Sequence, residues 1–241
     1  MTGFDAVAVA DEITRALRAA GTAERAAWDK GYLKSELEHL GVKLPDQRRI
    51  AREVWQRYAP GREELVALVE ALWETRLHDR RAHAVILLAR GAKLLQADDL
   101  PLVERLLRES RTWALVDELA THVAGSLVER EPRLGRTLDH WARDDDFWIR
   151  RSALLALLRP LRAGGGDFER FARYADGMLE EKEFFVRKAI GWLLREVSKK
   201  RPELVAEWLA PRARRASGLT VREAVKHLPA KMRAQVMASR G

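Results

Sequence analysis

The stretch Glu181–Glu203 reads EKEFFVRKAIGWLLREVSKKRPE, and its helical periodicity indicates the fold. At 100° per residue, an aliphatic sector that includes Val186, Ile190 and Val197 covers one side of the predicted helix. The opposite side carries a narrow stripe formed by Lys188, Trp192, Arg195 and Lys199. The stretch therefore predicts an amphipathic helix whose tryptophan faces away from the core, among positive charges.

Similar stretches recur along the chain. Each opens with polar or helix-capping residues and continues as an alanine- and leucine-rich helix. The five stretches are HDRRAHAVILLA (78–89), RTWALVDELATHVAG (111–125), DDDFWIRRSALLALL (144–158), EKEFFVRKAIGWLLR (181–195) and GLTVREAVKHL (218–228). When they are aligned on one alanine in each, successive stretches lie 36, 33, 36 and 35 residues apart. This regular spacing is typical of a helical repeat protein.

A second amphipathic helix is predicted before each of these stretches. These second helices cover residues 62–74, 100–110, 133–144, 167–179 and 202–213. Helix-breaking residues stand where the helices of a pair should turn, at Pro60-Gly61, Gly91, Pro132, Gly164–Gly166 and Pro202. We therefore expect an all-α superhelix, a solenoid of HEAT-like helical repeats, in a single domain over residues 1–241. In such a fold, equivalent positions of successive repeats line one continuous concave groove.

The composition excludes several classes of protein. Hydrophobic residues make up 47% of the 241 residues, which excludes a disordered chain. The absence of cysteine excludes disulfides, thiol nucleophiles and thiolate zinc sites. Residues 1–20 lack the apolar run of a secretory signal, and no apolar run is long enough to span a bilayer. We expect a soluble cytoplasmic protein with no membrane partner.

The positive charge is concentrated at one end of the chain. The net charge of the chain is +8. Residues 181–241 contain 15 Lys/Arg and 6 Asp/Glu, whereas residues 1–180 contain 29 Lys/Arg and 30 Asp/Glu. Concentrated positive charge suggests a polyanionic partner, and nucleic acid is the commonest soluble one. The alternative is a solvated face on an arginine-rich chain. A cationic stripe with an aromatic ring, as around Trp192, suits a nucleic-acid backbone with a base or sugar beside it.

Two further helices carry side chains that do not fit a plain core. Trp113 and Asp117 are four residues apart, so they share one side of their helix at the margin of its apolar sector. They are either a core-edge ring and a surface charge, or a pair that stabilises a cation from two sides. Arg151 lies within a helix that is apolar nearly all round and needs a partner there. That partner could be an aspartate at the start of the helix (144–146), Asp117 or a phosphate.

Four segments together resemble the AlkD-like family of DNA alkylation-repair glycosylases. They are WDKGYLKSELEHLGVKLPDQRRIA (28–51), TWALVD (112–117), DDFWIRRSALL (145–155) and KEFFVRKAIGWLLRE (182–196), and the resemblance covers residues 28–228. It implies a superhelix that holds duplex DNA in its concave groove. It also implies excision of cationic N3- or N7-alkylated purines, with the lesion held at the protein surface and little enclosure of the base.

The resemblance assigns roles to residues of this chain. The catalytic set would be Trp113, Asp117, Arg151 and Trp192. The DNA-binding set would be Tyr32, Lys188, Arg195 and Lys199. We expect no cofactor and no metal, since His78 and His83 lie five residues apart and the other histidines are scattered. The protein would act as a monomer on double-stranded DNA with alkylated bases, associated with the nucleoid when bound.

The chemistry suits these side chains. A cationic alkylated purine is already a good leaving group, so the enzyme must stabilise the positive charge that develops on the sugar and supply water. Asp117 can do both, and the indole rings can offer electron-rich faces. Two other functions remain open, namely a non-catalytic DNA-binding scaffold and a HEAT-like protein-interaction module. Within the glycosylase hypothesis, the preferred lesion could be a methyl group or a bulky toxin adduct.

Overall fold

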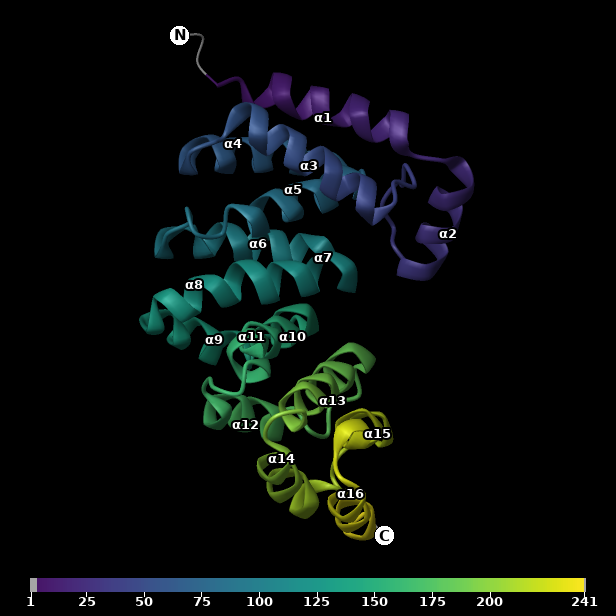
Figure 1. Ribbon diagram of the computed structural model, residues 1–241, viewed down its shortest axis with the longest axis vertical. Coiled ribbons are helices and arrows are strands. Elements are labelled where there is room, and N and C mark those ends of the chain that lie inside the picture. The colour runs from purple at the N-terminus through teal and green to yellow at the C-terminus, as the bar shows by residue number, and fades with distance from the viewer. Residues whose placement is uncertain (1–3, 241) are drawn as a thin grey trace. The chain divides into compact units, whose positions relative to one another are not determined.

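The computed structural model describes residues 4–240, and these residues fold almost entirely into helices. The α-helices are α1 Ala6–Ala20, α2 Ala23–Leu33, α3 Leu44–Tyr58, α4 Arg62–Trp73, α5 His78–Arg90, α6 Leu100–Ser110, α7 Trp113–Glu118, α8 Gly125–Arg130, α9 Gly135–Trp141, α10 Phe147–Leu155, α11 Leu158–Arg162, α12 Phe168–Gly177, α13 Phe184–Ser198, α14 Pro202–Leu209, α15 Gly218–Ala224 and α16 Ala230–Ala238 (Figure 1). Short 3₁₀ turns and one π-helical turn, Leu119–Ala124, join them. Between residues 4 and 240 the β-structure is limited to an isolated parallel bridge between Glu38 and Leu77. The predicted all-α class is confirmed.

The predicted helix pairs are present, with the breakers at their ends. The five recurring stretches form α5, α7, α10, α13 and α15, and the second helices form α4, α6, α9, α12 and α14. Gly61 is the N-cap of α4 and Gly91 the C-cap of α5. Pro202 occupies the first turn of α14, where its missing N–H costs no helical hydrogen bond. Local sequence signals therefore place these helix ends.

The repeat period reappears in the polar contacts. Several hydrogen bonds between neighbouring repeats join residues 34 to 37 apart, a separation close to the period of the sequence. Examples are Trp73 to Glu109, Arg108 to Asp144 and Tyr174 to Asp139. Within each unit, hydrogen bonds therefore join corresponding parts of neighbouring repeats, as expected of helical repeats. The prediction of helical repeats is confirmed.

The helices group into two compact units. Unit 1 is the chain up to Val103 together with Glu109–Leu119, and unit 2 is Glu104–Arg108 together with the chain from Ala120 onward. The expected single domain over residues 1–241 stays a prediction. No helix among residues 4–240 has the length and apolar character needed to cross a bilayer.

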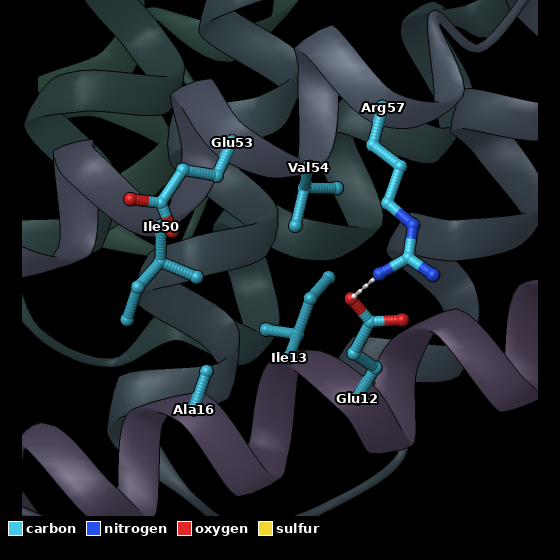
Figure 2. Close-up of a pocket in the computed structure, with 7 residues that line it drawn as sticks. All are labelled: Glu12, Ile13, Ala16, Ile50, Glu53, Val54 and Arg57. Atoms are coloured by element: carbon cyan, nitrogen blue, oxygen red, sulfur yellow. Dashed lines mark hydrogen bonds and ion pairs between the residues drawn. The ribbon is translucent and has the colours of Figure 1, made fainter.

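In unit 1, α1 packs against α3 and α4, and α5 packs against α3, α4 and α7. Figure 2 shows the contact between α1 and α3, where Ile13 faces Val54 and Arg57 forms an ion pair of 2.9 Å with Glu12. A small cavity of about 180 Å³ lies at this contact. Gly41, with φ of 76°, brings its loop close to α2, since a Cβ there would lie 2.3 Å from the backbone oxygen of Thr22. This close approach places the loop that precedes α3 beside α2.

In unit 2, α13 packs between α10 and α15 and also contacts α14. Gly191 makes the close approach of α13 and α15 possible, because a Cβ at this position would lie 2.8 Å from the Thr220 carbonyl oxygen. The buried aliphatic residues Val186, Ile190 and Val197 of α13 form the predicted apolar sector. The opposite side of α13 is left for the tryptophan and the cations.

Candidate functional site

An exposed pair of aromatic rings on α2 forms the first part of the candidate site in unit 1. Trp28 and Tyr32 are one helical turn apart, and their rings stack with centroids 4.7 Å apart and planes at 17°. The residues are 53% and 57% exposed. None of the residues of α2 is fully buried, so this helix presents its aromatic side to solvent.

Trp113 extends this pair. It is the first residue of α7, and its ring meets that of Tyr32 edge to face at 5.7 Å, with an interplanar angle of 83°. The structure thus brings together two residues that are far apart in the sequence and that the family resemblance selected. The sequence reasoning missed Trp28, although its four-residue spacing from Tyr32 is the signal that would have found it. We call Trp28, Tyr32 and Trp113 the aromatic platform.

A cavity of about 410 Å³ opens beside the aromatic platform. The platform residues line it together with Arg25, Asp29, Arg48, His78, Asp79 and Glu118, among others. The Arg25 guanidinium lies 4.4 Å from the Trp28 ring centroid and forms an ion pair of 2.8 Å with Asp29. Burial, and then the charge of the neighbouring His39, lower the pKa of His78 to about 4. The cavity therefore combines flat aromatic surfaces with charged groups of both signs.

Asp117 lies one turn after Trp113 on α7 and is half-buried, as is Trp113 itself. The side of α7 that carries Trp113 therefore also carries a carboxylate. A π-helical turn begins at Leu119, two residues after Asp117. Such turns occur mostly as single insertions in α-helices and frequently at functional sites.

In unit 2, Trp192 is half-buried on α13 beside a network of charges. Lys188 forms an ion pair of 2.8 Å with Glu223 of α15, and Arg195 contacts the same carboxylate. Lys199, at the C-cap of α13, lies 2.9 Å from Glu196. The three predicted DNA-binding cations are therefore held in place by two buried acids that the sequence reasoning did not select. The signal for Glu223 was its position one repeat after Lys188.

This network retains an excess of positive charge. Its cations are Arg162, Lys188, Arg195, Lys199 and Lys226, which surround the carboxylates of Glu196 and Glu223. Burial alone would raise the pKa of Glu223, but hydrogen bonds from Lys188 and Lys226 outweigh it and lower the pKa to about 2. The acids are thus charged at neutral pH, and Lys188 keeps 38% of its side chain exposed. The cations can still reach an anion outside the protein.

Arg151 is 3% exposed in α10 of unit 2. Its guanidinium donates a hydrogen bond to the backbone carbonyl of Phe185 and lies 5.9 Å from the Phe185 ring centroid. The neighbouring Arg150 donates hydrogen bonds to the carbonyls of Asp144 and Asp145 at the start of the helix. Arg151 therefore links α10 to the segment that carries Trp192. The catalytic and DNA-binding roles expected of these residues stay predictions.

A family model described as DNA alkylation repair enzyme matches residues 13–228, which is most of the chain. No curated protein matches the chain significantly. Among solved structures, an Enterococcus faecalis protein described as a predicted DNA alkylation repair enzyme is 23% identical, with a TM-score of 0.78, and the match covers 87% of this chain and 97% of that one. AlkD2 from Streptococcus mutans is 19% identical, with a TM-score of 0.60, and the match covers 86% and 99% of the two chains. At these identities the likeness shows a shared fold.

Proposed function

The chain belongs to the DNA alkylation repair enzyme family, and from that premise we propose that it is a DNA glycosylase. Its substrate is a cationic N3- or N7-alkylated purine in duplex DNA, and its reaction is hydrolysis of the N-glycosidic bond. The family accounts for a role in DNA alkylation repair. The aromatic platform beside the carboxylate-bearing side of α7 is the single observation that favours the glycosylase reaction within this role.

The proposed reaction depends on charge already present in the lesion. The bond between the sugar C1′ and the purine nitrogen breaks, the electron pair leaves with the base, and the base becomes neutral. Positive charge moves onto the sugar as an oxocarbenium ion, and water then forms the new C1′–O bond and releases a proton. Asp117 stabilises the developing cation and orients the water. The leaving base needs no protonation, so the reaction needs no cofactor.

The aromatic platform would recognise the damaged nucleotide. The faces of Trp28, Tyr32 and Trp113 are electron-rich and attract a cationic purine or sugar. Because Trp28 and Tyr32 are more than half exposed, the contact occurs at the protein surface. The base therefore need not enter a closed pocket, which supports tolerance of large adducts.

The cations of unit 2 would bind the DNA backbone. Lys188, Arg195 and Lys199 carry the excess charge of their network and would contact phosphates whatever the base sequence. Arg151 supports the same surface by linking α10 to the start of α13. In this proposal the side chains of unit 1 select the lesion and those of unit 2 bind the duplex.

An excision assay tests the proposal. Duplex DNA with a single N7-methylguanine is incubated with the wild type and with Asp117→Asn, and abasic sites are scored by alkaline cleavage. We expect the variant to excise roughly 10²- to 10³-fold more slowly, as when one charge-stabilising group is removed from an active site. Asp98→Asn removes an exposed carboxylate from the same unit and is the matched control, with excision unchanged.

Two results would contradict the proposal. Asp117→Asn could excise as fast as the wild type, or the wild type could excise neither N7-methylguanine nor N3-methyladenine nor a bulky cationic adduct. Salt-dependent binding to duplex DNA without excision would favour the non-catalytic DNA-binding scaffold. The absence of both binding and excision would favour a protein-interaction module.

A further inference from the structure

Two imidazole rings of unit 1 lie side by side where the isolated β-bridge forms. His39 directly follows Glu38 and His78 directly follows Leu77, the two bridged residues. The bridge is closed by hydrogen bonds from Glu38 N–H to the Arg76 carbonyl, at 2.9 Å, and from His78 N–H to the Glu38 carbonyl, at 2.8 Å. In a parallel pair, residues at equivalent positions point to the same side. The backbone therefore holds the two rings together, with centroids 4.4 Å apart and planes at 16°.

Asp79 stands next to this pair and is oriented by its own contacts. The residue is 3% exposed, and its carboxylate accepts hydrogen bonds from the Leu40 N–H at 2.7 Å and the Val42 N–H at 3.0 Å. The Gln47 amide donates to the Asp79 backbone carbonyl at 3.2 Å. These hydrogen bonds hold Asp79 in one orientation, as the groups that hydrogen-bond to a metal-ligating side chain do. Each carboxylate oxygen has two lone pairs, so the oxygen that faces Leu40 retains one for a further partner.

The ring nitrogens are buried without protein partners. Neither Nδ1 nor Nε2 of His39 has a hydrogen bond within the part of the chain from residue 4 to 240, and the same is true of Nε2 of His78. Buried polar atoms in folded proteins are nearly always paired, so three unpaired nitrogens in one cluster require an explanation. One ligand atom from each of His39, His78 and Asp79 lies within 4.8 Å of the others.

We propose that His39, His78 and Asp79 bind one divalent transition-metal ion such as zinc. Imidazole nitrogen together with a carboxylate oxygen suits zinc, cobalt and nickel, whereas magnesium and calcium require mainly oxygen ligands. The stacked rings rotate about their side-chain torsions to bring one nitrogen each to about 2.0–2.1 Å from the ion. Water or a substrate atom completes the coordination.

The ion would act as a clip within unit 1. His39 belongs to the loop between α2 and α3, whereas His78 and Asp79 begin α5. Metal binding would therefore fasten this loop, and α2 beside it, to the start of α5. His78 and Asp79 also line the cavity beside the aromatic platform, so the clip would hold the wall of that cavity in place. This inference does not depend on the glycosylase reaction.

Metal titration of the full chain tests the inference. The protein is treated with a chelator, returned to buffer and titrated with Co²⁺ while its visible absorption is recorded, and Zn²⁺ binding is measured by calorimetry. We expect one ion per chain and the absorption bands of Co²⁺ bound to nitrogen and oxygen ligands. Zn²⁺ should also raise the thermal midpoint, because it binds only the folded site.

Substitutions at the ligands should weaken this binding. His39→Gln and His78→Gln should each lower the affinity for the metal ion by at least roughly 10- to 100-fold. Loss of a ligand costs no less affinity than loss of a group that hydrogen-bonds to a ligand. His140→Gln and His227→Gln remove exposed histidines elsewhere and should bind as the wild type does. Far-ultraviolet circular dichroism confirms that each variant is folded.

Three results would overturn the inference. The folded wild type could bind neither Co²⁺ nor Zn²⁺, or His39→Gln and His78→Gln could retain wild-type affinity and absorption. Loss of binding in His140→Gln or His227→Gln would instead assign the ion to the surface. Amide hydrogen exchange adds a direct readout, since Zn²⁺ should slow exchange in residues 36–42 of the wild type and leave it unchanged in His78→Gln.

Discussion

Units 1 and 2 are built from the same kind of helix pair but gather different side chains around their candidate sites. Unit 1 exposes the aromatic platform and buries neutral imidazoles, including His83, which is fully buried. Unit 2 buries two carboxylates, Glu196 and Glu223, beneath partly exposed cations. The shared repeat thus sets the positions of the side chains, while their identity decides which chemical groups each unit can bind. This difference leads to four predictions.

The largest expected effect concerns the acid stability of unit 1. Burial lowers the pKa of His83 to about 4, whereas an imidazole in the unfolded chain titrates near 6.5. The contribution of neutral His83 to the free energy of unfolding is complete above pH about 6.5. About 2–3 kcal/mol of this free energy is lost as the pH falls towards about 4. Denaturant unfolding of the wild type and His83→Asn at pH 7 and pH 4.5 measures it.

We expect the wild type to lose more stability than His83→Asn between these two pH values. His227→Gln, at an exposed site, should retain the wild-type dependence. If the wild type and His83→Asn lose equal stability between pH 7 and pH 4.5, the buried His83 imidazole is not a cause of the acid sensitivity of unit 1.

The second prediction concerns lesion recognition. Trp113→Ala should lower kcat/KM for a cationic lesion by roughly 10- to 100-fold, because stacking of a base on an aromatic ring contributes about 1–3 kcal/mol. Trp113→Phe keeps an aromatic face and should lose less. Affinity for undamaged duplex, measured by fluorescence anisotropy, should change little. A large loss of that affinity with normal excision would reverse the roles proposed for the two units.

The third prediction concerns the carboxylate that anchors the cations of unit 2. Glu223→Gln should destabilise the protein by about 1–2 kcal/mol at pH 7, less than for a fully buried ion pair because Lys188 and Lys226 are partly exposed. Since the pKa of Glu223 is lowered to about 2, its contribution persists above pH about 4.5 and is lost as the pH falls towards about 2. The free energies of unfolding of the wild type and Glu223→Gln, measured across this pH range, should therefore converge at low pH.

Hydrogen exchange, corrected for intrinsic rates, can locate these acid transitions. With falling pH, amides around His83 in α5 should lose protection first, and those of α13 and α15 should follow. Loss of protection in α13 and α15 at the higher pH would contradict this order.

The smallest expected effect is electrostatic. Lys188→Ala should weaken binding to any duplex a few-fold, by under about 1 kcal/mol, and reduce the salt slope of binding by about 1, as expected for one phosphate contact. Lys231→Ala makes the same charge change on α16 and serves as the control. Identical salt slopes for the two variants would show that the excess charge of the network around Glu223 does not contact DNA.

Much of the fold could be predicted because it depends on local periodicity. The helices of each pair, their breakers and the spacing of 33 to 36 residues are properties of short segments, and the polar contacts 34 to 37 residues apart follow from stacking such segments. The stripe on α13 was likewise available from its helical wheel. In contrast, the wheel contained no information about Glu223, which reaches Lys188 and Arg195 from a different helix.

The residue pattern alone was enough to specify an all-α repeat, a tryptophan within a cationic stripe and a carboxylate one turn after Trp113. Folding was needed to bring Tyr32 against Trp113, to place buried acids beneath the cations and to stack His39 on His78. The physical reason is one of range. Helix formation and its apolar side are governed by residues three or four positions apart, whereas contacts between distant residues arise when helices pack and when a backbone bridge sets two segments in register.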